Sequence, residues 1–314
     1  AGRPAKTTPL TLVLEQAGAH FSVVNGWERS DYFKPTADFT ETYGYTLNEV
    51  HEVVAAEVAM VQNGVGLAEV NGFNRIEITG EGASDWLDYM ICSRVPRKLG
   101  KVGLGYLLNN DGNVKAEATI ANLPDGRIWY GSAAAAEFHD MDWLTEHLPG
   151  DGSVQLRSLT NDYTILVLAG PQSRDVLSAC SRGDWSAKGF PWLRVREARI
   201  GHAPAMVMSV SFSGELAYEI HVPNASLYAA YLALMKAGAN SKIGHFGARA
   251  IDSMRMEKGY LHWKSDLITE FDPFETSLDR FVHMDKEFHG KAALLARGGE
   301  KRRVLRMLEV GATH

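Results

Sequence analysis

Apolar and polar residues follow two spacings along the chain, and each spacing predicts one type of element. Helical spacing predicts helices over residues 50–63, 83–90, 133–147, 173–180, 225–237 and 248–258. Alternating or short continuous apolar runs predict strands over residues 74–79, 104–108, 114–121, 127–131, 163–169, 205–212 and 217–222. Because strands and helices mix without a strict β–α–β alternation, the pattern predicts the α+β class rather than a doubly wound sheet.

Polar segments mark the ends of these elements. Thr46–Glu49 matches a capping box at a helix start, and Asn109–Gly112 is a turn signal between two strands. A second hairpin is expected across Ser213–Glu215. Pro149–Gly152 is the clearest linker. We therefore expect an N-terminal lead segment over 1–45, a first α+β half over 46–150, a second over 151–297, and a short C-terminal region over 298–314.

Composition describes a soluble globular protein. Among 314 residues, 45% are apolar and 22% charged, and the net charge is −6. A mildly acidic chain argues against a nucleic-acid surface. No apolar run reaches the roughly 18 to 20 residues that a membrane span needs. Two cysteines, Cys92 and Cys180, are too few for a disulfide framework, so we expect a reducing, cytoplasmic location.

Common signatures of cofactor and nucleophile sites are missing. The sequence has no dinucleotide fingerprint, no P-loop and no Gly-x-Ser-x-Gly elbow. His51-Glu52 begins like a zincin motif, but Ala55 stands where the second histidine is needed. We therefore expect no metal site, and no nicotinamide or flavin bound by this chain alone.

Two predicted strands carry glutamates opposite their apolar faces. In the first strand, alternation places Glu117 on the outer face. In the second strand, it places Glu219 and His221 together on the outer face. The inward positions of the two strands are apolar: Val114, Ala116, Ala118, Ile120, Tyr218, Ile220 and Val222. Such carboxylates can bind the N–H edge of a heteroaromatic ring. The ordinary alternative is that both are solvated strand positions.

Two longer segments resemble a known family. Residues 211–223, Ser-Phe-Ser-Gly-Glu-Leu-Ala-Tyr-Glu-Ile-His-Val-Pro, resemble the folate-binding hairpin of the glycine-cleavage T-protein (aminomethyltransferase) superfamily. Residues 254–263 resemble the Arg-x-Glu-Lys-Gly-Tyr-x-x-Trp stretch of its dimethylglycine and sarcosine dehydrogenase branch. Shorter matches occur at 2–10, 26–29, 168–174, 272–275 and 285–291. The resemblance covers residues 1–310 or so.

The resemblance implies a T-protein-like α+β fold with a ferredoxin-like subdomain and a small C-terminal barrel. Residues 304–310 fall where that barrel begins in the family, and the chain ends at His314. We therefore expect the barrel to be missing or truncated in this chain.

The resemblance also assigns roles to two carboxylates and one aromatic residue. Glu219 matches the glutamate that binds the pterin ring of tetrahydrofolate, and Phe212 matches an aromatic residue, often tyrosine, that packs near it. Glu117 lies where most members have the catalytic aspartate, and the dimethylglycine dehydrogenase branch is similar in having glutamate. Leu104 is a departure, because T-proteins commonly have a folate-contacting tyrosine there; Tyr106 lies two residues further along.

Three further residues match family positions less specifically. Arg255 and Tyr260 match the folate entrance, and Trp192 falls in an aromatic segment that lines the pterin pocket. Each has an ordinary alternative. Arg255 is three residues from Asp252 and can form a surface ion pair, and the two aromatic residues can be core residues.

The implied function is tetrahydrofolate-dependent one-carbon transfer from a small N-methylated substrate, with Glu117 as general base or as a stabiliser of the cationic donor. Either a flavoprotein oxidase or dehydrogenase partner, or a missing N-terminal half, is then expected to generate the iminium donor of the methylene group. Three alternatives stay open: direct methyl transfer from an onium donor of the betaine type, folate binding without catalysis, and a family member that has changed its ligand.

Overall fold

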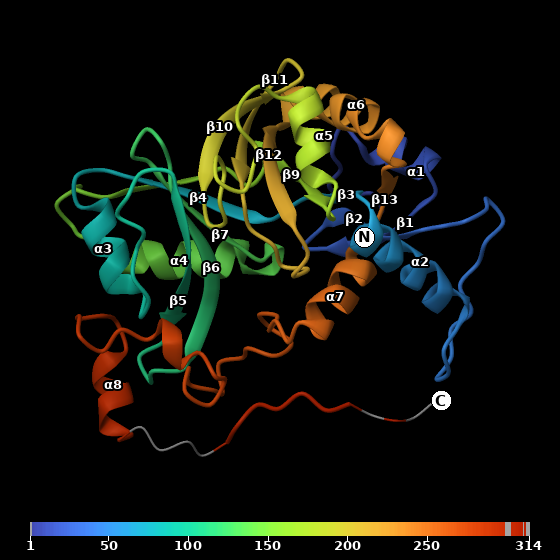
Figure 1. The fold of residues 1–314 in the computed structure, drawn as a ribbon. Coiled ribbons are helices and arrows are strands. Elements are labelled where there is room, and N and C mark those ends of the chain that lie inside the picture. Colours follow the sequence, from blue (N-terminus) through green and yellow to red (C-terminus); the bar gives the residue numbers. More distant parts are fainter. Residues whose placement is uncertain (1, 299–302, 310, 312–314) are drawn as a thin grey trace. The chain divides into compact units, whose positions relative to one another are not determined.

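The computed structural model describes residues 2–298, 303–309 and 311 (Figure 1). These residues form two compact units, and neither is continuous in sequence. The first unit contains residues 2–72 and 161–260, and the second contains residues 73–160, 261–298 and 303–309. The predicted division at residue 150 does not coincide with this grouping, because the strand that follows the Pro149–Gly152 linker pairs within the same sheet as the strands before it.

The first unit is built on a six-stranded sheet with strand order β10-β11-β12-β9-β3-β13. Its strands are β3 (Gly66–Val70), β9 (Tyr163–Ala169), β10 (Val195–Ile200), β11 (Ala203–Met208), β12 (Ala217–Pro223) and β13 (Gly244–His245). A separate hairpin joins β1 (Ala19–Val24) to β2 (Trp27–Phe33). The helices are α1 (Thr11–Gln16), α2 (Glu49–Asn63), α5 (Ser173–Cys180), α6 (Leu227–Ala237) and α7 (Ala248–Glu257).

Helices cover both faces of this sheet. On one face, α5 and α6 pack with α1 over a core that includes Leu168, Tyr218 and Ile220 (Figure 1). On the other face, α2 and α7 pack over Ala68 and Ala217. The predicted inward direction of Tyr218, Ile220 and Val222 is confirmed. The opposite face, which carries Glu219, is therefore partly covered by helices rather than solvated.

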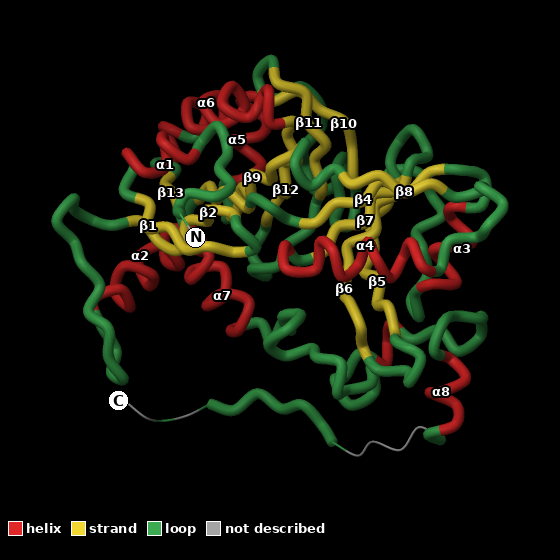
Figure 2. Tube along the Cα trace, turned by 180° about the vertical axis from the view of Figure 1, so that it is seen from behind, coloured by secondary structure: helices red, strands yellow, loops and turns green. Residues whose placement is uncertain are grey.

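The second unit is built on a five-stranded antiparallel sheet with order β5-β6-β7-β4-β8. Its strands are β4 (Asn74–Thr79), β5 (Lys101–Leu108), β6 (Val114–Asn122), β7 (Ile128–Ser132) and β8 (Gln155–Ser158). Helices α3 (Ala83–Met90) and α4 (Glu137–Glu146) pack on one face. Residues 261–298, with η4 (Asp279–Phe281) and α8 (Lys291–Ala296), supply a second apolar cluster around Tyr106. Figure 2 shows that most of this later segment is loop.

The predicted elements agree with the structure at most positions, and the α+β class is confirmed. Three details differ from the prediction. Helix α2 is capped by Asn48, whose side chain accepts a hydrogen bond from Val50 N at 3.2 Å, rather than by Thr46. Strand β11 ends at Met208, so an eight-residue loop, 209–216, replaces the expected tight hairpin. The N-terminal lead contains α1, β1 and β2.

Two absences hold for the part of the chain that the structure describes. Residues 303–309 contain no helix or strand, and no closed barrel is present among the described residues. None of the described helices is both long and apolar enough to cross a membrane.

Candidate functional site

Glu219 lies at the centre of the first unit's sheet, on the face that α2 and α7 partly cover. Its register partners on both sides are apolar: Val167 on β9 and Met208 on β11. Ala68 on β3 extends this row beyond Val167. Directly paired residues present their side chains on the same face. Glu219 is therefore a half-buried carboxylate in an otherwise apolar row.

His221 is the polar neighbour of Glu219. The two residues share a face of β12, as predicted, and His221 Nε2 lies 3.3 Å from Glu219 Oε2. His221 is buried, so this face of β12 is not the solvated face that the ordinary alternative expects. At this distance the contact attracts one carboxylate oxygen when the ring carries a proton on Nε2.

The loop over residues 209–216 carries Phe212 and is fixed at its tip. Gly214 has φ +78°, and a Cβ there would lie 2.3 Å from Lys258 Cγ. Glu215 forms an ion pair with Lys258 Nζ at 3.2 Å. These contacts join the loop to the residue that directly follows α7. Phe212 itself is partly buried.

Arg255 and Tyr260 are brought together at the end of α7. Arg255 Nη1 donates to the carbonyl oxygen of Tyr260 at 3.0 Å, and Tyr260 N donates to the carbonyl oxygen of Arg255 at 3.0 Å. The ion pair with Asp252 exists, with Nε to Oδ1 at 2.7 Å. It is not a surface pair on the arginine side, because Arg255 is only 5% exposed. Tyr260 is 41% exposed and is therefore not a core aromatic residue.

Trp192 lies on an exposed loop. The side chain is 67% exposed, so the alternative of an ordinary core aromatic is wrong. The next residue, Leu193, has φ +56° and donates its amide to Ser209 O at 2.9 Å. The Trp192 loop is thereby attached to the start of the loop that carries Phe212.

Glu117 belongs to the second unit, whereas the five other predicted site residues belong to the first. It lies on β6 and is half-buried beside the apolar cluster formed by residues 261–298. Desolvation raises the pKa of this carboxyl, and a side-chain hydrogen bond with Tyr106 partly opposes the rise. A half-buried carboxyl with a raised pKa is typical of functional groups.

The predicted alternation along β6 is correct beyond residue 115. Ala116, Ala118 and Ile120 pack on the α3 and α4 side, opposite Glu117. Val114 does not follow them and belongs to the cluster on the Glu117 side. A register shift between Leu107 and Leu108 is the cause, because it leaves Lys115 as an extra residue of β6.

Leu104, where the family commonly has tyrosine, pairs with Thr119 on the same face as Glu117. It is 37% exposed. Tyr106 is the residue that the sequence interpretation set aside. The structure pairs it directly with Glu117. A count along the hairpin from its turn could not have found this pair, because the register shift changes every partner beyond it.

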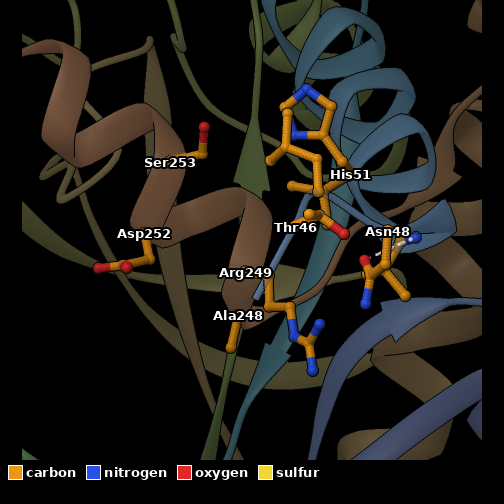
Figure 3. Close-up of a pocket in the computed structure, with 10 residues that line it drawn as sticks. Thr46, Asn48, His51, Ala248, Arg249, Asp252 and Ser253 are labelled. Atoms are coloured by element: carbon orange, nitrogen blue, oxygen red, sulfur yellow. Dashed lines mark hydrogen bonds between the residues drawn. The ribbon is translucent and has the colours of Figure 1, made fainter. Parts of the chain in front are cut away.

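A surface hollow lies elsewhere in the first unit, beside the N-termini of α2 and α7 (Figure 3). It has a volume of about 570 Å³. Its lining residues are Thr46, Leu47, Asn48, Val50, His51, Val54, Ala248, Arg249, Asp252 and Ser253. None of the six predicted site residues lines it. Among the described residues there is no group of three or more His, Cys, Asp or Glu side chains that could hold a metal ion.

Comparison with known protein families decides the assignment. The family model described as the GCVT N-terminal domain matches residues 10–286. The chain belongs to the GCVT N-terminal domain family. The resemblance inferred from the sequence is therefore confirmed over most of the chain.

Two curated relatives of this GCVT-domain chain illustrate its context. Mitochondrial dimethylglycine dehydrogenase of Rattus norvegicus is 28% identical over 311 residues, which cover 97% of this chain and 36% of that protein. The formaldehyde-forming 4-methylaminobutanoate oxidase of Paenarthrobacter nicotinovorans is 30% identical over 298 residues, which cover 94% of this chain and 36% of that protein. The chain thus spans about a third of the length of these relatives.

A solved structure shows the same fold. Glycine cleavage system aminomethyltransferase T from Bartonella henselae matches with a TM-score of 0.78 at 22% identity, covering 93% of this chain and 74% of that one. The predicted T-protein-like fold of this GCVT-domain chain is confirmed.

Proposed function

We propose that this chain binds tetrahydrofolate through Glu219 and takes part in transferring a one-carbon unit from a small N-methylated compound. The observation that carries the proposal is the half-buried Glu219 carboxylate on a central strand, flanked in its row by Val167 and Met208. Membership of the GCVT N-terminal domain family supports it.

The chemistry of these residues fits a reduced pterin. The two oxygens of Glu219 can accept parallel N–H bonds from the amino-pyrimidinone edge of the ring, and charge assistance strengthens such bonds. The apolar neighbours suit the ring faces, and Phe212 supplies a further apolar surface. His221 Nε2 lies 3.3 Å from Glu219 Oε2 and, when protonated, would limit the orientations of the carboxylate. Arg255 and Tyr260 remain our candidates for contacts with the glutamate tail, and Trp192 for the pterin surround.

Glu117 is proposed as the catalytic carboxylate. When bound, the folate supplies the amine nitrogen that accepts the carbon unit. Glu117 takes up the proton that this amine loses, or stabilises positive charge on the donor. Its raised pKa suits proton uptake, because a general base works best when its pKa lies nearer the operating pH.

The donor is proposed from the names of relatives. Those names include a dimethylglycine dehydrogenase and a 4-methylaminobutanoate oxidase, both of which point to N-methyl compounds. Since the chain spans about a third of these proteins, we propose that a flavoprotein oxidase or dehydrogenase, as partner or as further sequence, makes the reactive donor.

Calorimetric titration with tetrahydrofolate tests the binding site. Glu219→Ala should weaken binding by at least about a hundredfold, since it removes a pair of charge-assisted hydrogen bonds. Glu197→Ala is the matched control: Glu197 is exposed on β10 and pairs with Met206, the residue opposite His221, on the same sheet face. It should bind like wild type.

Turnover with a methylene donor separates catalysis from binding. Glu117→Gln should keep its folate affinity and lose turnover, because the amide cannot take up a proton. Equal affinity of wild type and Glu219→Ala would refute the folate site. Binding without turnover in wild type would leave a folate-binding subunit, and a 5-methyl product would indicate direct methyl transfer.

A further inference from the structure

The β5–β6 hairpin brings one tyrosine directly opposite the proposed catalytic carboxylate. Tyr106 on β5 is the register partner of Glu117 on β6. At the turn, Asn109 N donates to Asn113 O, and Leu108 pairs with Val114. Continued without interruption, this count would place Ala116 opposite Tyr106.

A β-bulge changes that register. The shift lies between Leu107 and Leu108, where Lys115 is the additional residue of β6. The Lys115 carbonyl accepts a hydrogen bond from Trp263 Nε1 at 2.9 Å, so its acceptor is satisfied from outside the ladder. The bulge thus has its own stabilising contact, and its result is the Tyr106–Glu117 pair.

The surroundings hold Tyr106 in place. Its side chain is 2% exposed and packs in the cluster with Leu278 and Phe288. The Phe281 ring lies 5.1 Å away, measured between centroids. Burial and the neighbouring Glu117 raise the pKa of the Tyr106 hydroxyl, which therefore stays protonated and acts as the donor toward the carboxylate.

We infer that Tyr106 is the positioning residue for Glu117: its hydroxyl donates to the carboxylate and holds it in one orientation beside the apolar cluster. This inference rests on the proposed function for its catalytic meaning. A glutamate side chain has one more rotatable bond than an aspartate, so a carboxylate at this position needs an additional restraint to be held for proton uptake. Tyr106 supplies that restraint from the neighbouring strand.

Other charged and titratable groups lie around the pair. Lys115, on the same strand, directs its ammonium group over the Trp143 ring at 4.2 Å. Tyr130 on β7 would repel Glu117 only as a tyrosinate, but burial keeps its hydroxyl protonated, and that hydroxyl donates to Asp140 at 2.7 Å. Arg280 on η4 lowers the pKa of the Tyr106 hydroxyl electrostatically, and Cys92 raises it. For Glu117 itself, the hydrogen bond with Tyr106 opposes the rise in pKa that desolvation causes.

Tyr106→Phe is the direct test, because it removes the hydroxyl and keeps the ring. The carboxyl signal of Glu117 is followed by carbon-13 NMR of the glutamate-labelled 314-residue chain and identified by its loss in Glu117→Gln. In Tyr106→Phe the titration of Glu117 should move to higher pH. On the acidic limb of the pH profile, kcat/KM should fall about tenfold, as expected for loss of a hydrogen bond to a charged group, and kcat should also fall severalfold on the plateau, because the carboxylate is no longer held in one orientation.

Tyr130→Phe is the matched control. It removes an equally buried tyrosine–carboxylate hydrogen bond in the same unit. It should lower the melting temperature without moving the Glu117 titration. An unchanged Glu117 titration in Tyr106→Phe, or the same movement in Tyr130→Phe, would overturn the inference. A movement confined to Tyr106→Phe in a protein without turnover would support the pair and refute the proposed function instead.

Discussion

Arg255 shows how much one side chain can do at the residue scale. Its planar guanidinium donates to Asp252 through Nε and to the Tyr260 carbonyl through Nη1, so one group connects α7 to the chain that follows it. A lysine ammonium is a point donor on a flexible stem and cannot reproduce both directions.

Arg255→Lys should therefore lower the free energy of unfolding by about 1.5 to 3 kcal/mol, which is the usual loss for one hydrogen bond to a charged group. If Arg255 also contacts the glutamate tail, affinity for a polyglutamylated folate should fall more than affinity for a folate without its glutamate. Chemical denaturation and calorimetry measure the two effects. Arg199→Lys, an exposed substitution on β10, is the control and should change neither.

At this scale, the sequence predicts the direction of a side chain where that direction depends on one strand alone. It does not predict burial or pairing where these depend on another part of the chain. Alternation alone separated Glu219 and His221 from Tyr218. It could not show that His221 is buried, because that depends on distant residues covering the face. Tyr106 was missed because a bulge, and not the spacing of apolar residues, sets its partner.

At the scale of elements, α7 lacks a cap of its own. Its N-cap residue is Gly247, and no acidic residue lies in its first turn. Glu57 on α2 supplies the missing group: its carboxylate accepts from Gly247 N at 2.8 Å and from Phe33 N at 2.7 Å. Desolvation outweighs these hydrogen bonds and raises the pKa of Glu57 to about 7.

This raised pKa makes stability depend on pH. The folded state holds a proton that the unfolded state releases, so the contribution is present below the unfolded pKa and is lost as pH rises through about 7. Relative to Glu57→Gln, wild type should lose up to about 3 kcal/mol of unfolding free energy between about pH 5 and about pH 8. Urea denaturation over that range measures the difference.

Two features keep this experiment specific. Burial also raises the pKa of Glu69 to about 7, but Glu69 is present in both proteins and cancels in the difference. Glu52→Gln changes an exposed residue on the same helix and should give a constant difference. A difference between wild type and Glu57→Gln that does not vary with pH would contradict the assignment.

Elements with strong local signals were predictable. Strands β4 and β9 and helices α3 and α5 have the predicted bounds, since each combines an apolar pattern with flanking turn residues. Strands β8 and β13 were missed because they are short and take their stability from pairing with β4 and β3. Pairing partners far apart in sequence leave no local pattern.

At the scale of the whole molecule, each unit is completed by a later part of the chain. In the second unit, residues after 260 cover one face of the sheet through Leu267, Leu278 and Phe288. Lys286 also donates to the carbonyl oxygens of Asp88 and Ile91, at the C-terminal end of α3.

Removal of residues 261–314 should therefore destabilise the second unit selectively, because it exposes Tyr106 and Val114 and leaves the α3 carbonyl groups without this donor. Hydrogen exchange followed by mass spectrometry should show lost protection in β5, β6 and β7 and retained protection in β9 and β12. Equal loss in both units would mean that the chain unfolds as one cooperative body.

The discontinuous units also set an order for biosynthesis. A ribosome releases residues 2–72 before the rest of these 314 residues, yet β3 cannot pair with β9 until β9 has been made, about a hundred residues later. The sheet over residues 73–160 has all five of its strands by then and is the first of the two larger sheets that can close. Its Glu117 face stays uncovered until residues 261–298 emerge, so the proposed catalytic carboxylate is among the last parts of the nascent chain to leave water.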